Sequence, residues 1–174
     1  MPLRIASSIL VLTLAAAPLG LAQGGFQILT GRKLKDAIPR DFYLEGSALA
    51  VEKRNAVLVE TPSGKRVLLA LIVTSGWASQ LPHKYSGMLI SEGPLSVCGR
   101  RLMVGSYGFG LHRPAVESTR DAQFILYNQA GQRIWGCFAK KDLHLREPRP
   151  LQTILETPHS ARLYIGRYEL ELRP

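Results

Sequence analysis

From residue 54 onward, short apolar runs alternate with turn-forming residues. Two β-branched runs, 55–61 (NAVLVET) and 66–75 (RVLLALIVTS), flank the sequence Pro-Ser-Gly-Lys, which predicts a β-hairpin. The second run is apolar at successive positions, so we expect a central strand that is covered on both faces. Residues 121–141 predict a second hairpin, which turns at 128–131.

The last residues show the period of a strand most clearly. Tyr168, Leu170 and Leu172 alternate with charged residues, which predicts a strand with one buried and one exposed face. Segments of this kind number about nine or ten, with turn signals roughly every 8–12 residues. The pattern predicts an all-β fold, a single antiparallel β-sandwich, with a closed or partly open β-barrel as the alternative.

Little helix is expected. The one candidate lies in residues 31–46 (GRKLKDAIPRDFYLEG), where Pro39 stops a helix after a turn or two. We find no internal repeat and no low-complexity linker. The sequence therefore predicts a single β domain over residues 23–174, in which residues 23–46 form an N-terminal lead-in segment.

Residues 104–112 (VGSYGFGLH) combine three glycines with aromatic residues. A dinucleotide-binding loop has the order GxGxxG before a helix, and a P-loop ends in Lys-Ser or Lys-Thr. Here the order is GxxGxG, Leu111 and His112 follow the last glycine, and no helical sequence comes next. Phosphate binding is therefore not expected, and the segment is interpreted as a strand.

The two faces of that strand differ sharply. Tyr107, Phe109 and Leu111 point to one side, which we expect to face the core, while Gly108 and Gly110 leave the other side bare. Glycine inside a strand is tolerated where another backbone, ring or ligand approaches closely. We expect an aromatic ring from a neighbouring segment on the bare face. The alternative is a shallow ligand platform with His112 at its edge.

The first 22 residues have the parts of a secretory signal peptide. Arg4 precedes an apolar run that begins at Ile5, and Gly20 and Ala22 occupy the −3 and −1 positions of a cleavage site. The run is short for a membrane span, which needs about 20 apolar residues. We therefore expect an exported protein, periplasmic or extracellular. The longest later apolar run, residues 67–73, predicts no transmembrane segment after signal removal.

The chain is basic, with a formal net charge of +9. Removal of the predicted signal peptide takes away only one charged residue, Arg4, so the mature chain stays strongly positive. Outside the cytoplasm, such a charge favours anionic neighbours, such as envelope polymers, lipid headgroups or acidic glycans. Nucleic-acid binding requires a denser basic stripe or a recognisable module, and neither is present, so no nucleic acid is expected.

Cys98 and Cys137 are the only cysteines. An oxidising compartment and an even count favour one disulfide between them, and two free buried thiols are the alternative. Such a bridge closes a loop of about 40 residues and contributes roughly 3–4 kcal/mol in the chain-entropy model.

No catalytic or metal-binding motif stands out. The sequence contains no GxSxG elbow, and the four histidines, at positions 83, 112, 144 and 159, lack metal-ligand spacing. Acidic residues are sparse in the middle of the chain. We therefore expect binding rather than catalysis, without a metal or cofactor.

One segment combines aromatic and basic residues. Trp77, Lys84 and Tyr85 lie in a predicted loop, and the basic pair Arg100–Arg101 follows it. Aromatic rings beside cations suit sugars, anionic polymers or a partner protein. We take these residues, with His112, as the candidate binding surface. The alternative is that Trp77 caps the core.

Residues 41–46 (DFYLEG), 53–76, 84–93 and 104–111 together resemble a family of small secreted bacterial proteins of uncharacterised function. The resemblance covers most of the mature chain and implies a bacterial origin, but it assigns no functional residue. We expect a non-catalytic binding or interaction domain of the bacterial envelope, whose partner is an anionic polymer, a glycan or another envelope protein. The alternatives are a small β-barrel that carries an apolar ligand and a hydrolase that acts on envelope polymers.

Overall fold

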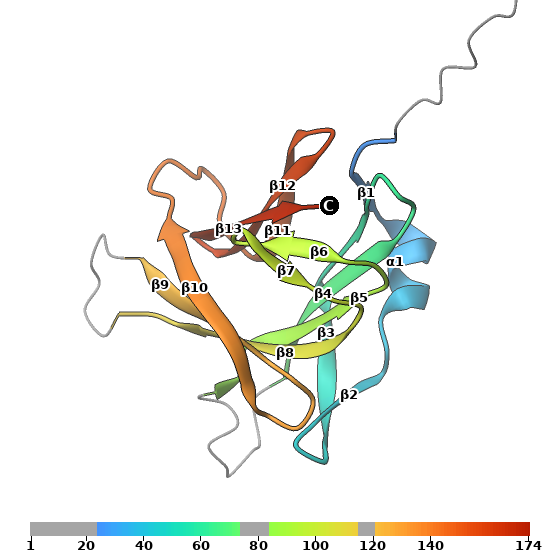
Figure 1. Ribbon diagram of the computed structural model, residues 1–174, viewed down its shortest axis with the longest axis vertical. Helices are drawn as coiled ribbons and strands as arrows, with labels where there is room; N and C mark the ends of the chain where they lie inside the picture. The colour runs from blue at the N-terminus through green and yellow to red at the C-terminus, as the bar shows by residue number, and fades with distance from the viewer. Residues whose placement is uncertain (1–23, 74–83, 115–120) are drawn as a thin grey trace, which may run out of the picture.

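The computed structural model describes residues 24–73, 84–114 and 121–174 (Figure 1). The predicted signal peptide, Trp77 and His83 lie outside these ranges. The described chain is almost entirely antiparallel β structure with one short helix. Its elements are, in order, β1 (Gln27–Leu29), α1 (Gly31–Ala37), β2 (Asp41–Leu44), β3 (Ser47–Glu60), β4 (Arg66–Ile72), β5 (Gly87–Ser91), β6 (Leu95–Val97), β7 (Arg100–Leu102), β8 (Gly105–His112), β9 (Ala122–Tyr127), β10 (Arg133–Lys141), β11 (Arg149–Thr157), β12 (Ser160–Gly166) and β13 (Tyr168–Arg173).

The strands form one continuous sheet that nearly closes into a barrel. The order is β1-β3-β4-β5-β8-β9-β10-β13-β12-β11. Off this path, β2 pairs with β3, the short β6 pairs with β13, and β7 pairs with β6. At the far end of this strand order, β11 lies beside β3 and β1. The all-β prediction is confirmed, and the architecture is the barrel alternative rather than the sandwich. The described chain has thirteen strands instead of nine or ten, because several have only three or four residues.

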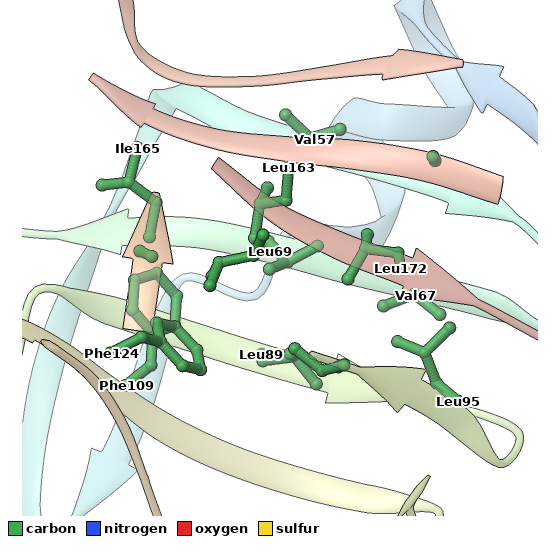
Figure 2. Close-up of a cluster of buried hydrophobic side chains, with 14 of the residues drawn as sticks. Val57, Val67, Leu69, Leu89, Leu95, Phe109, Phe124, Leu163, Ile165 and Leu172 are labelled. Carbon is green, nitrogen blue, oxygen red and sulfur yellow. The ribbon is translucent and has the colours of Figure 1, made fainter. Parts of the chain in front are cut away.

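Alternate side chains from most strands fill the interior of the barrel (Figure 2). Phe109 and Phe124 stack with their ring centroids 5.6 Å apart, and both are fully buried. Leucine, valine and isoleucine side chains from β4, β5, β12 and β13 pack around them. The period of two in residues 168–173 therefore corresponds to inward and outward positions on β13, as predicted.

A second apolar layer covers the outer face of β3, β4, β5 and β9. It contains residues of β2 and the residues around α1, such as Phe42 and Ile38. On β4, Leu69 faces the interior and Ala70 faces this outer layer, and both are fully buried. The prediction of a central strand covered on both faces is confirmed. The helix α1 ends at Ala37, two residues before Pro39.

The bare face of β8 is covered by the residues that precede β5. A Cβ atom on Gly108 would lie 2.9 Å from the ring of Tyr85, and one on Gly110 would lie 2.2 Å from the backbone oxygen of Lys84. Phe109, between the two glycines, points into the interior. The predicted ring is therefore present on the glycine face, and a neighbouring backbone covers the rest of it.

This close approach predicts a large cost for a small substitution. Gly110→Ala forces the backbone at Lys84 to move, and overpacking of this kind costs about 1–3 kcal/mol. Gly24→Ala is the control, because its Cβ would meet only Pro62, at an ordinary 3.6 Å, and should change stability by less than about 0.5 kcal/mol. Urea unfolding of both variants measures the difference. Equal stabilities would contradict the packing described for β8.

Candidate functional site

The sheet forks where β10 leaves β13. The two strands pair only at Lys140 and Lys141. Further along, β13 pairs with β6 instead, and this edge of β10 has no strand partner among the described residues. The disulfide Cys98–Cys137 spans the fork, with Cα atoms 6.5 Å apart, and the backbone N–H of Cys98 donates to the carbonyl of Glu171 at 3.0 Å. The predicted disulfide is therefore present.

A groove of about 330 Å³ lies at this fork, on the outer face of the sheet. Strands β10, β11, β12 and β13 and the turn after β6 contribute to it. Its lining combines three carboxylates, two cations, an aromatic ring and the disulfide: Cys98, Phe138, Lys140, Glu156, Arg162, Glu169, Leu170 and Glu171. We call it the fork groove.

Arg162 is held between two carboxylates. Its Nε lies 2.6 Å from Glu156 Oε1, and its Nη1 lies 2.9 Å from Glu169 Oε2. The three side chains come from β11, β12 and β13, which are neighbours in the sheet, so their outward positions fall side by side. These hydrogen bonds to Glu156 and Glu169 raise the pKa of Arg162 above its ordinary value.

A buried tyrosine extends this network. The hydroxyl of Tyr164 lies 3.0 Å from Glu169 Oε2 and 3.1 Å from Asp142 Oδ2, so its single proton can be donated to either oxygen. Burial raises the pKa of Tyr164 to about 12. The backbone N–H of His144 and the Tyr164 hydroxyl hold the pKa of Asp142 below its ordinary value. At neutral pH, Tyr164 therefore stays protonated and Asp142 stays ionised.

Phe138 stands at the wall of the groove with 73% of its surface exposed. The strand period places it there, because Trp135, Cys137 and Ala139 point into the barrel and Phe138 points outward. An exposed aromatic ring next to charged hydrogen-bonding groups suits a ligand that has both an apolar face and hydroxyl groups.

The groove offers hydrogen-bond acceptors beside its ion pairs. Glu156 and Glu169 both contact the Arg162 guanidinium, and Glu171 also belongs to the lining. A carboxylate has two oxygens, so one that pairs with a guanidinium can also accept a hydrogen bond from a hydroxyl group of a ligand.

The predicted residues Lys84 and Tyr85 lie elsewhere and hold parts of the barrel together. The ammonium group of Lys84 pairs with Glu45, donates to the carbonyl of Gly131 at 2.7 Å, and lies 5.1 Å from the ring centroids of both Tyr85 and Tyr127. Tyr85 is 1% exposed and donates to Glu45 Oε1 at 2.7 Å. This cluster joins the β2–β3 turn, the segment before β5 and the β9–β10 turn.

The other candidate residues that the structure describes lie on β7 and β8. Arg100 and Arg101 are exposed on β7, and the structure gives neither an ion pair within the described chain. His112 ends β8 beside Gly110, and its Nε2 is buried without a hydrogen-bond partner among the described residues. Trp77 lies outside the described ranges. His112 lies near the backbone of Lys84, because both approach Gly110, whereas Arg100 and Arg101 lie on a different strand.

Apart from the predicted disulfide cysteine Cys98, the residues of the fork groove were not singled out from the sequence, although a signal for some of them is present. Glu169 and Glu171 occupy the outward positions of the clear alternation in β13. The same period, applied to β10, places Phe138 on the solvent side, which is unusual for an aromatic ring. The approach of Glu156 and Arg162 depends on the β11–β12 pairing, which the sequence pattern alone does not specify.

In the part of the chain that the structure describes, no three His, Cys, Asp or Glu side chains are placed to share a metal ion. That part also has no helix of sufficient length and apolarity to cross a membrane. Comparisons of the chain with family models, curated proteins and solved structures gave no match.

The disulfide predicts a measurable stabilisation of the fork. Its cysteines are 39 residues apart, and a bridge that closes such a loop contributes roughly 3–4 kcal/mol in the chain-entropy model. Cys98→Ser/Cys137→Ser should lower the free energy of unfolding by that amount in urea without reductant. Thiol titration of the unreduced, unfolded wild-type protein should detect no thiol, and two reactive thiols would refute the bridge.

The Glu45 cluster predicts a stability that depends on pH. Hydrogen bonds from Lys84 and Tyr85 lower the pKa of Glu45 in the folded state. The resulting stabilisation is present above the unfolded-state pKa of about 4.3 and is lost as the pH falls through the lower folded-state value. Glu45→Gln should therefore be less stable than wild type at pH 7, and the difference should shrink below about pH 4.

Urea unfolding at pH 7, 5 and 3 tests this dependence. Lys84→Met should show the same trend, because it removes the hydrogen bond that does most to lower the pKa of Glu45. A difference between wild type and Glu45→Gln that is constant or grows toward pH 3 would contradict the assignment.

Proposed function

We propose that this protein is an exported, non-catalytic binding domain of the bacterial envelope, and that its fork groove binds an uncharged segment of a glycan. The observation that carries the proposal is the position of Phe138, an exposed ring at the wall of a groove lined by carboxylates and cations. The ring can stack on the apolar face of a sugar, and the charged groups can bond to its hydroxyls.

The charges in the groove favour a glycan over a polyanion. Its lining has three carboxylates against Lys140 and Arg162, and Arg162 already pairs with Glu156 and Glu169. An anionic polymer would meet net repulsion there, whereas hydroxyl groups can bond to both signs of charge.

Separate observations support the proposal that the protein is exported. The first 22 residues have the pattern of a signal peptide, and a disulfide fits an oxidising compartment. Packed apolar side chains occupy the described barrel interior (Figure 2), so an apolar ligand would bind outside that interior.

Titration with oligosaccharides tests the proposal. We expect N-acetylglucosamine tetramer or maltotetraose, added to the mature protein, to shift the NMR signals of Phe138 and Lys140. Phe138→Ala should weaken binding about tenfold or more, equivalent to about 1.4 kcal/mol. Its exposure means that the fold should tolerate the change.

Tyr43→Ala is the matched control, because Tyr43 is another exposed aromatic residue, at 60%, and does not line the groove. It should bind the oligosaccharide like wild type. Equal losses in the two variants, or no shift at the groove with either saccharide, would refute the proposed site.

A further inference from the structure

A second groove, of about 390 Å³, lies where the sheet fails to close. On the edge of β3 that faces β11, β1 pairs at residues 58–60 and β2 pairs at residues 47–50. Between the β2-paired and β1-paired stretches, this edge of β3 has no strand partner in the described chain. The facing strand, β11, pairs only with β12. Two unpaired strand edges thus border one groove, which we call the seam groove.

The residues at this seam explain why it stays open. Pro150 on β11 has no N–H to donate to a neighbouring strand. Arg54 on β3 and Arg149 on β11 line the same groove, and like charges on facing edges oppose pairing. At one end the seam is fastened, because the N–H of Phe26 donates to the carbonyl of Pro158 at 2.8 Å.

The lining of the seam groove combines apolar side chains with two arginines and several uncharged polar residues, Thr30, Asn55, Gln152 and Thr153. Ile28, Leu34 and Val57 are among its apolar residues, and no carboxylate is among those that the structure places in its lining. Neither Arg54 nor Arg149 forms an ion pair within the described ranges. Both guanidinium groups can therefore receive an anion.

One buried polar atom at the seam also has no partner. Thr153 belongs to the groove lining, and its buried hydroxyl oxygen makes no hydrogen bond within the described chain. A buried hydroxyl without a hydrogen-bond partner is costly, so the free protein leaves one hydrogen-bonding group at this groove unsatisfied.

We propose that the seam groove binds a single fatty acyl chain that ends in a carboxylate. The chain lies against Ile28, Leu34 and Val57, and Arg54 and Arg149 hold the carboxylate through charge-assisted hydrogen bonds. The volume is at the lower end of small-molecule sites, about 300–1,000 Å³, which suits one acyl chain rather than the two of a membrane lipid. The seam groove shares no residue with the fork groove, so this proposal is independent of the glycan proposal.

Calorimetric titration of the mature protein with dodecanoate, below its micelle concentration, tests the inference. Burial of each methylene strengthens binding about fourfold, so decanoate should bind about 15-fold more weakly. Dodecanol, which lacks the charge, and acetate, which lacks the chain, should each bind at least tenfold more weakly than dodecanoate. Equal affinity for dodecanoate and either analogue would overturn the proposal.

Variants locate the site. Arg54→Gln/Arg149→Gln should weaken dodecanoate binding at least tenfold, whereas Arg100→Gln/Arg101→Gln removes two exposed arginines elsewhere and should leave it unchanged. Ile28→Glu places a carboxylate in the groove at a position that is 39% exposed and should abolish binding. Thermal unfolding checks that each variant is folded. Equal effects of the two arginine pairs, or full binding by a folded Ile28→Glu variant, would refute the assignment.

Discussion

The structure depends on the burial of alternate side chains inside one curved sheet. Phe109 and Phe124 stack at the centre of this interior, and aliphatic side chains from both ends of the sheet pack around them. Strands at both ends of one sheet can direct their side chains into the same apolar interior only if the sheet curls. The near-closed barrel follows from this burial, and both grooves lie where closure is incomplete.

A second constraint acts on the outside of the barrel. The outer faces of β3, β4 and β5 are also apolar and lie beneath α1 and β2. On neighbouring β8, the backbone before β5 approaches so closely that only glycine fits at position 110 without a shift. Lys84 and Tyr85 cover this face and also contact Glu45 and Tyr127, which gives the aromatic and basic residues there a structural role.

Local pattern accounts for much of the fold. The hairpins β3–β4 and β9–β10, the helix stop before Pro39, the two faces of β8 and the disulfide were predicted from the sequence. The sandwich was favoured and the barrel was the alternative, but both require the same alternation within each strand, so the sequence pattern could not decide between them. Only the pairing of β10 with β13 and the approach of β11 to β3 decide between them. The fork groove depends on the same non-local pairings, so its residues could not be collected from sequence spacing.

The pairing of β6 with β13 has a consequence for how the chain folds. Val97 lies opposite Leu172, so strands from the middle and the end of the chain must meet before the barrel is complete. Contacts between residues so distant in sequence slow folding, because the entropy of loop closure is lost before the contacts form. A chain that still lacks its last strand leaves the edges of β6, β10 and β12 without this partner. Such edges pair readily with other chains, so aggregation competes with folding until the C-terminal strand arrives.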